Sequence, residues 1–168
     1  GGGTLDVSLV ERFDNVISVT AVSGDNRLGG QDFDSAIARG FCEDCGVDFD
    51  ALEPRQREMI LRQAETCKMA LTQQDMVIMA VDDGTLSASL TLNNEWLIRK
   101  GGPLFKRMTD PIQRVFLDAG VSPAEMDDLV MVGGSSHMPV VRRYISRFLR
   151  KEPVKDSRPD TAVAIGAG

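Results

Sequence analysis

The sequence predicts an α/β fold in which a mixed sheet is flanked by helices and carries an inserted helical and β segment. Three observations support this class. Alternating apolar residues near the start indicate a β-hairpin, a fully apolar run over residues 129–132 indicates a buried strand, and several long stretches carry apolar residues at helical spacing. One chain of 168 residues is long enough to bury a core of this kind.

The hairpin is expected in the first 22 residues. Residues 4–10 and 16–22 alternate as strands do, and the turn formers Asp14 and Asn15 separate them. Residues 23–27 are rich in turn formers and predict a loop. Asp32 is then a suitable N-cap for a helix that reaches about Cys45. The middle of the chain alternates between elements: a helix over residues 54–71, strands over 76–81 and 86–92, a helix capped by Asn93 or Asn94, a break at residues 101–103, and a helix that Gly120 ends.

The apolar run at residues 129–132 is the centre of the predicted sheet. Four apolar residues in succession are typical of a strand that is buried on both faces. Gly133 and Gly134 follow at once, and Pro139 suits the first turn of a helix that runs to about Leu149. A strand, a glycine turn and a helix can bring backbone N–H groups to a phosphate. An ordinary connecting loop would give the same pattern.

Composition limits the function classes. The chain carries a net charge of −6, so no excess of cations is left for non-specific nucleic-acid binding. The sequence has no apolar run long enough to cross a bilayer. It begins inside one motif and stops inside another, so we expect a piece of a longer protein. Cys42 and Cys45 form a C-x-x-C, but with one histidine in the chain a zinc site lacks ligands, and we expect reduced structural thiols.

Four segments together resemble a known family. They are residues 1–7 (GGGTLDV), 28–34 (LGGQDFD), 129–139 (LVMVGGSSHMP) and 159–168 (PDTAVAIGAG). In order and spacing they are similar to lobe II of the ATPase domain of DnaK-type seventy-kilodalton heat-shock chaperones. The resemblance covers essentially the whole chain. It implies an actin-like (ribonuclease H-like) lobe, with a core from residues 1–29 and 107–168 and an inserted cap from residues 30–106.

The resemblance also implies nucleotide-binding residues. In the family, residues at the matching positions contact the phosphates and the ribose and adenine edge of the nucleotide. Others form the loop around the adenosine or lie near the base. These are Gly1, Gly2, Gly3 and Thr4 for the phosphates; Glu65, Lys68 and Thr72 for the ribose and adenine edge; Gly133, Gly134 and Ser135 for the adenosine loop; His137 where an arginine usually stacks on adenine; Asp160 near the base; and Gly30 with Gln31 in a hinge-side loop.

Other interpretations of these residues stay open. Glu65 and Lys68 are three apart on a helix and could simply pair with each other, which is worth only about 0.2–0.5 kcal/mol. Asp160 could serve only as the N-cap of a last helix. Met69, His137 and Gln31 depart from the usual arginines and carboxylate, which favours a divergent branch such as the HscC-type chaperones.

The family resemblance implies a cytoplasmic chaperone whose complete domain binds ATP or ADP with magnesium. It assigns no catalytic residue and no metal ligand to this chain, because the first phosphate loop and the catalytic lysine belong to lobe I, so the chain alone should be inactive. Expected partners are lobe I, a peptide-binding domain, a J-domain co-chaperone and a nucleotide-exchange factor, with no nucleic acid and no membrane. The alternatives are a non-catalytic lobe that binds an exchange factor and a sugar or acetate kinase lobe.

Overall fold

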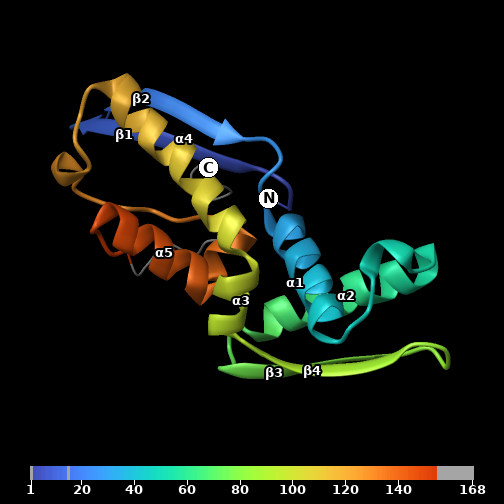
Figure 1. Cartoon of the computed structure of the whole chain (residues 1–168). Coiled ribbons are helices and arrows are strands. Elements are labelled where there is room, and N and C mark those ends of the chain that lie inside the picture. Colours follow the sequence, from blue (N-terminus) through green and yellow to red (C-terminus); the bar gives the residue numbers. More distant parts are fainter. Residues whose placement is uncertain (1, 15, 155–168) are drawn as a thin grey trace.

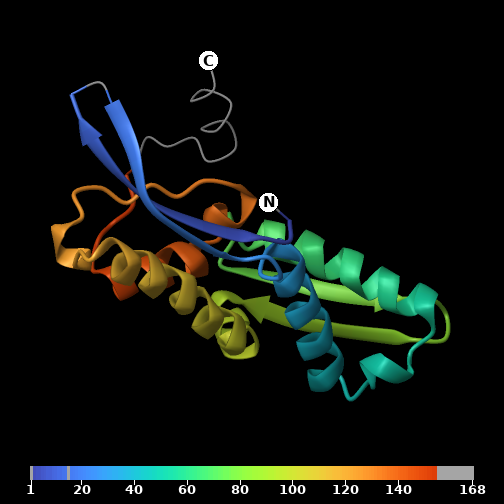
Figure 2. The same ribbon diagram turned by 90° about the horizontal axis from the view of Figure 1, so that it is seen from above.

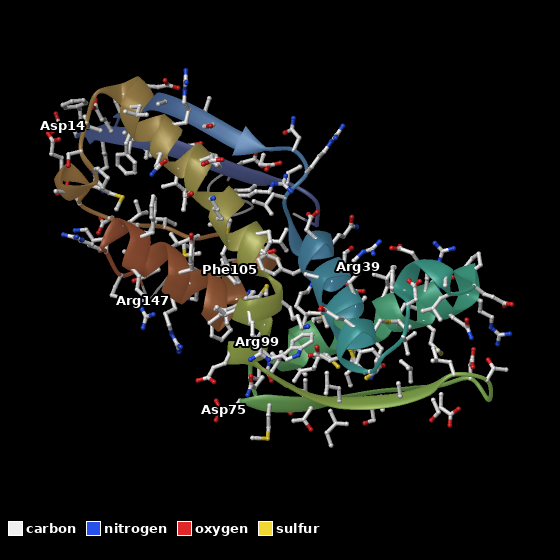
Figure 3. The ribbon with its side chains drawn as sticks, in the orientation of Figure 1. Asp14, Arg39, Asp75, Arg99, Phe105 and Arg147 are labelled. Atoms are coloured by element: carbon white, nitrogen blue, oxygen red, sulfur yellow. The ribbon has the colours of Figure 1, made fainter. Side chains whose placement is uncertain are left out.

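The computed structural model describes residues 2–14 and 16–154, and this part of the chain is an α/β structure built on two β-hairpins. One hairpin and two helices form one end of the molecule, and the other hairpin with two helices forms the opposite end (Figures 1 and 2). In the side-chain view, Asp14 marks the tip of the first hairpin and Asp75 the start of the second, on opposite sides of the molecule (Figure 3). No helix among the described residues is both long and apolar enough to span a membrane.

The first hairpin pairs β1 (Leu5–Phe13) with β2 (Val16–Asp25) in antiparallel register, with an irregularity between Leu9 and Val10. The predicted strands are confirmed, but β2 runs on through three residues that were expected to form a loop, because they pair with Leu5–Val7 across the ladder. The turn residue Asp14 has a φ of 51°, as a tight hairpin requires. Asn15 lies outside the described residues.

Only one face of this hairpin is covered within the described residues. Helix α4 (Gly102–Ala119) packs along both strands (Figure 1), over the side of β1 whose residues are half-buried. Large apolar residues of the hairpin remain in solvent: Val10, Phe13, Val16, Ile17, Val19 and Val22 are each more than half exposed, at 53–69%. They include the consecutive strand residues Val16 and Ile17, which point to opposite faces. Exposed apolar residues in this number are typical of a segment that packs against another part of a protein.

The second hairpin belongs to a unit of two helices and two strands. α1 (Gly30–Asp44) and α2 (Pro54–Ala70) pack on each other, and α2 packs on β3 (Met76–Asp82), which pairs with β4 (Ser87–Asn93). A short 3-10 turn, η1 (Phe49–Ala51), precedes α2. These elements match the predicted helices and strands closely, because the apolar residues of α2 and the alternate residues of β3 fall on one buried face.

The predicted break between two helices is also present. The residue before α3 (Asn94–Lys100) is Asn93, whose side chain accepts a hydrogen bond of 2.8 Å from the Trp96 amide, so Asn93 rather than Asn94 is the cap. Gly101 ends α3, and α4 begins at the next residue. Gly120 ends α4 with a φ of 68°, a left-handed conformation that glycine adopts without strain.

An aromatic cluster joins the two ends of the molecule. The Phe105 ring on α4 lies 5.4 Å from the Phe33 ring on α1 and 5.2 Å from the Tyr144 ring on α5 (Pro139–Leu149). Figure 3 shows Phe105 where α4 turns toward α1. Offset and edge-to-face aromatic contacts at these distances stabilise by more than their buried area alone. The helices are therefore fixed to one another around Phe105.

The central strand predicted over residues 129–132 is not formed as expected. Within residues 2–14 and 16–154 this segment makes one parallel bridge, between Leu129 and Pro153, and its burial alternates. Met131 is buried, whereas Val130 and Val132 are 58% and 47% exposed. A strand needs neighbours on its edges, and a single bridge gives it only one. The mixed sheet is accordingly reduced to two antiparallel pairs and this bridge.

A polar cluster ties α1 to α3. Asp44 accepts hydrogen bonds from Trp96 Nε1 at 2.7 Å and from Lys100 Nζ at 2.6 Å, and Lys100 also bonds Glu43 at 2.9 Å. These donors, the lysine first and the indole second, lower the pKa of Asp44. The contribution of ionised Asp44 to stability is therefore complete above 3.8, the ordinary pKa of an aspartate. It is lost as the pH falls through the lowered pKa that Asp44 has in the folded protein.

We expect Asp44→Ala to lower the free energy of unfolding by about 1–2 kcal/mol at neutral pH, because Trp96 Nε1 and Lys100 lose their acceptor. Chemical denaturation at several pH values checks this. The difference from wild type should shrink in acid, where Asp44 is protonated. Glu43→Ala, which removes a more exposed partner of the same lysine, serves as the control and should cost less. An equal loss in both variants would contradict the assigned role of Asp44.

Candidate functional site

The N-terminus of α1 lies directly against the glycine run that precedes β1. A side chain on Gly29 would have its Cβ 2.7 Å from the backbone of Gly3 and 2.8 Å from that of Gly2, closer than real Cβ contacts. The Gln31 amide donates a 2.9 Å hydrogen bond to the Gly2 carbonyl. The two glycine segments, 26 residues apart in the sequence, therefore share one contact that only glycine permits.

The cap of α1 differs from the expected one. Gly29, not Asp32, is the N-cap residue, and Asp32 lies in the first turn, where its carboxylate accepts a 2.8 Å hydrogen bond from the Gly29 amide. The glycine run at the start of the chain explains the difference, because a side chain at position 29 would collide with Gly3. The carboxylate that bonds the Gly29 amide therefore comes from Asp32, three residues later. Asp32 still satisfies a free amide and still places negative charge at the positive end of the helix.

Gly30, Lys68 and Ser135 meet at the same place. An ideal Cβ on Gly30 would lie 3.2 Å from Lys68 Nζ and 3.5 Å from Ser135 Oγ. Lys68 Nζ also donates a 3.0 Å hydrogen bond to the Gly30 carbonyl. α1, α2 and the loop after residue 132 thus bring a cation, a hydroxyl and an open glycine together, beside the Gly2 carbonyl at 3.9 Å from the same ideal Cβ. We call these residues, with Gly3, the glycine–lysine cluster.

Asp34 supports this cluster, and the sequence did not single it out. Its Oδ1 lies 2.8 Å from Lys68 Nζ, and both side chains are nearly buried, with 11% and 13% of their surfaces exposed. The contact is an ion pair without an aligned hydrogen bond, so Oδ1 has no hydrogen-bond donor. Burial raises the pKa of the Asp34 carboxyl and Glu65 adds to the rise, whereas Lys68 opposes it. A carboxylate placed between Phe33 and Ile37, on the apolar face of a helix, was the available signal.

Glu65 and Lys68 do not form the simple pair that was one alternative. In the described part of the chain Lys68 pairs with Asp34 instead, and the Glu65 side chain is exposed on α2. The physical reason is reach: Lys68 lies on the edge of α2 that faces α1, so its stem extends to the buried carboxylate rather than back along its own helix. Thr72 follows the end of α2, and its hydroxyl donates a 2.6 Å hydrogen bond to the Met69 carbonyl.

The glycine loop before α5 is a short 3-10 helix, η3 (Gly134–His137), and not a simple turn. Gly133 precedes it with a φ of 88°, which favours glycine. Buried Ser136 closes the loop, since its hydroxyl and amide both bond the Gly133 carbonyl at 2.7 and 3.0 Å. Gly134 has no atom within 4 Å of an ideal Cβ, so its backbone is open to a ligand.

The remaining predicted residues are not part of the cluster. Thr4 is exposed, and its hydroxyl donates to Asp6 at 3.2 Å. His137 has an exposed side chain at the end of η3. Gly1 and Asp160 lie outside the described residues, as does the last helix predicted over residues 159–168.

The cysteines give no competing site. Cys42, Cys45 and Cys67 are free, and burial raises the pKa of each thiol, as expected for unreactive structural cysteines. In residues 2–14 and 16–154 no group of three or more His, Cys, Asp or Glu is arranged to hold a metal ion.

The cluster has the chemistry of a phosphate or nucleoside site. Open glycine backbone lets an anionic group approach closely, a lysine supplies positive charge, and a serine hydroxyl can bond a sugar or phosphate oxygen. Within the protein, Lys68 Nζ already bonds the Gly30 carbonyl and pairs with Asp34. A ligand that binds Lys68 would therefore share a cation whose position these two partners fix.

Comparison with known proteins shows which family the whole chain resembles. The family model described as "Hsp70 protein" matches residues 1–168. Chaperone protein dnaK3 of Synechocystis sp. is 36% identical over 99% of this chain, which spans 23% of that relative. A chaperone protein HscA homolog of Acidovorax sp. is 35% identical, and Chaperone protein DnaK of Thermus thermophilus 36%, each over 99% of this chain and over 26% and 29% of the relative.

Proposed function

The chain belongs to the Hsp70 protein family, and we propose that it is lobe II of a chaperone nucleotide-binding domain. In this role it binds the adenosine and phosphates of ATP or ADP and contributes to a cycle of hydrolysis that drives protein folding. It spans only about a quarter of the curated relatives it matches, so the activity of a whole protein is part of the proposal.

The convergence of the glycine–lysine cluster carries this proposal. Segments around residues 2, 30, 68 and 135 are far apart in the sequence, and each matches a nucleotide-contact position of the family. Packing against Gly3 accounts for glycine at position 29, whereas a Cβ at Gly30 would be nearest to the ends of the Lys68 and Ser135 side chains, so backbone packing gives little reason for glycine there. A ligand that must approach the backbone gives such a reason.

The residues present fit a nucleotide phosphate group better than a directly bound metal. Gly2 and Gly3 meet only the Gln31 side chain, at 3.7–4.0 Å from an ideal Cβ, so their backbone is accessible. Magnesium would be held mainly by the nucleotide phosphates, and when bound it would neutralise their charge. The residues of this chain bind and orient: Lys68 and Ser135 hold the nucleoside end, and the glycine run faces the phosphates.

The exposed apolar residues of the first hairpin also fit one lobe of a larger protein. We infer that other parts of the parent cover Val16, Ile17 and their neighbours, since a monomer seldom exposes so many large apolar residues within one hairpin. Lobe I, a peptide-binding domain, a J-domain co-chaperone and an exchange factor are the proposed partners, and the cytoplasm is the proposed location.

Calorimetric titration of magnesium–ADP into the complete two-lobed domain tests the proposal, with this chain alone as the control. We expect a Kd of about 1 μM or tighter for the whole domain, which corresponds to about −8 kcal/mol, and little binding by the chain alone. Absence of binding by both would overturn the nucleotide role and favour a non-catalytic interaction lobe. ATP consumption that depends on an added sugar or acetate would favour a kinase.

A further inference from the structure

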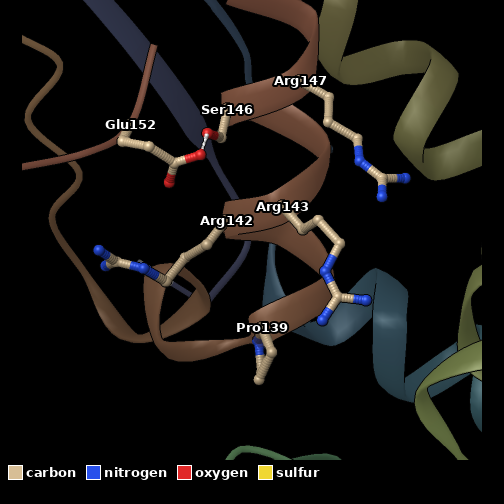
Figure 4. A pocket seen from close by; sticks show the side chains of 6 residues that line it. All are labelled: Pro139, Arg142, Arg143, Ser146, Arg147 and Glu152. Atoms are coloured by element: carbon tan, nitrogen blue, oxygen red, sulfur yellow. Dashed lines mark hydrogen bonds between the residues drawn. The ribbon is translucent and has the colours of Figure 1, made fainter. Parts of the chain in front are cut away.

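One face of α5 carries a concentration of cations that the nucleotide proposal does not use. Arg142, Arg143 and Arg147 lie at helical spacing and line an open hollow of about 480 Å³, together with Pro139, Ser146 and Glu152 (Figure 4). Figure 4 shows Arg142 extending from one side of the helix and Arg143 and Arg147 from the other, and all three line the hollow. None of the glycine–lysine cluster residues lines this hollow.

These cations have no ion-pair partners in the described part of the chain. The whole protein carries a net charge of −6, with 25 acidic and 19 basic residues, so three neighbouring unpaired arginines on one helix run against its overall charge. The one carboxylate that lines the hollow, Glu152, accepts a 2.6 Å hydrogen bond from buried Ser146. The face therefore keeps a local positive charge on an acidic protein.

A second, more apolar hollow adjoins the first. It has a volume of about 250 Å³ and shares Arg143 and Arg147 with the larger one. Its other lining residues come from α3, α4 and α5: Ile98, Gly102, Phe105, Lys106, Val140 and Tyr144. Lys106 adds a fourth cation, also without an ion-pair partner among residues 2–14 and 16–154. Arg143 and Arg147 thus lie between the electropositive larger hollow and the aromatic and aliphatic smaller one.

We propose that this face of α5 docks an acidic, amphipathic segment of a partner protein. Carboxylates of the segment would pair with Arg142, Arg143 and Arg147, and an apolar side chain would enter the hollow beside Ile98 and Phe105. Charge complementarity selects this partner: a planar guanidinium pairs with a carboxylate through two parallel hydrogen bonds, and arginine and tyrosine are enriched in binding hot spots. The proposal does not depend on nucleotide binding, because it uses none of the same residues.

Other occupants are less suited to the two surfaces together. A free anion such as phosphate would use the arginines but would leave the apolar hollow empty. A nucleic acid would meet four cations on a protein of net negative charge, which is a poor electrostatic footprint. An acidic segment with an apolar side chain satisfies both surfaces at once.

The test measures binding of the full chain to a fluorescently labelled peptide of alternating Glu and Leu pairs, by anisotropy at low salt. We expect the double variant Arg143→Gln/Arg147→Gln to bind about tenfold more weakly, equivalent to about 1.4 kcal/mol. Arg12→Gln/Arg55→Gln removes the same charge from exposed sites on β1 and α2 and should stay within about twofold of wild type. Ile98→Ser should weaken binding separately through the apolar hollow.

Four binding results would overturn the proposal. These are equal losses in the two double variants, equal binding of a control peptide with Gln in place of Glu, and complete competition by inorganic phosphate or tighter binding of a single-stranded oligonucleotide. All substituted side chains are exposed, so the variants should keep the wild-type thermal transition. A lowered transition in the arginine variant alone would instead assign these residues to stability and would also count against docking.

Discussion

Gly29→Ala is expected to lower the free energy of unfolding by about 1–3 kcal/mol and to weaken nucleotide binding by the complete domain at least about tenfold. The new Cβ would lie 2.7–2.8 Å from backbone atoms of Gly2 and Gly3, and backbone cannot move aside as the end of a flexible side chain can. The glycine run or the start of α1 must then shift. A shift of either would break the 2.9 Å hydrogen bond from the Gln31 amide to the Gly2 carbonyl.

Chemical denaturation of the chain and calorimetry of the complete domain measure the two effects. Gly102→Ala is the matched control, because the same methyl group at the start of α4 meets nothing within 4 Å. Its stability should be unchanged or higher by up to about 1 kcal/mol, since alanine favours a helix over glycine. If Gly29→Ala matched this control in both measurements, the close contact between the two glycine segments would contribute neither to stability nor to nucleotide binding.

Local signals in the sequence predicted most of the elements correctly. The left-handed end of α4 at Gly120 follows from the conformational freedom of glycine, and α3 ends at Gly101, within the predicted break. Apolar periodicity likewise placed α2 and its buried face. Such features are decided by neighbours in the chain, so a sequence contains them fully.

Features decided by distant contacts were less predictable. The apolar run over residues 129–132 was interpreted as a strand buried on both faces, but burial depends on neighbouring strands, and the described residues supply one bridge. Asp32 was taken for the cap of α1 because the collision between position 29 and Gly3 is invisible in the sequence. The division into core residues 1–29 and 107–168 and cap residues 30–106 stays a prediction.

The candidate site shows the same contrast. The resemblance named Gly30, Lys68 and Ser135 before any geometry was known, and these residues do meet. The carboxylate that orients Lys68 was missed, since Asp34 looks like one more residue of a helix that begins with Asp32. Whether these residues hold a nucleotide stays a proposal, and Asp160 lies outside the described residues.

Lys68→Met is expected to lower the free energy of unfolding by about 2–3 kcal/mol at neutral pH, because it leaves the Asp34 carboxylate buried without its cation. Methionine keeps most of the aliphatic stem, so the loss reports the charge rather than the packing. The value lies below that of a fully buried pair because each side chain retains some contact with solvent, 13% and 11%. Nucleotide binding by the complete domain should weaken in the same variant.

The pH dependence identifies the cause. Burial already raises the pKa of Asp34 in the folded protein, and removing Lys68 removes the contribution that opposes this rise. The folded variant then binds a proton more readily than the unfolded chain, so its stability increases as the pH falls through the raised pKa toward the ordinary value of 3.8. The destabilisation is therefore largest at neutral pH and smallest in acid.

Lys68→Met/Asp34→Asn provides the decisive comparison, because a neutral amide replaces the uncompensated charge. Unfolding free energies measured between about pH 4 and pH 8 should show the double variant recovering most of the loss and losing the pH dependence of the single variant. Equal destabilisation of the single variant at every pH would mean that Lys68 stabilises through its stem and its bond to Gly30. Recovery of stability without recovery of nucleotide binding would separate the two roles of Lys68, since the neutral amide at position 34 needs no cation whereas the nucleotide still needs the lysine.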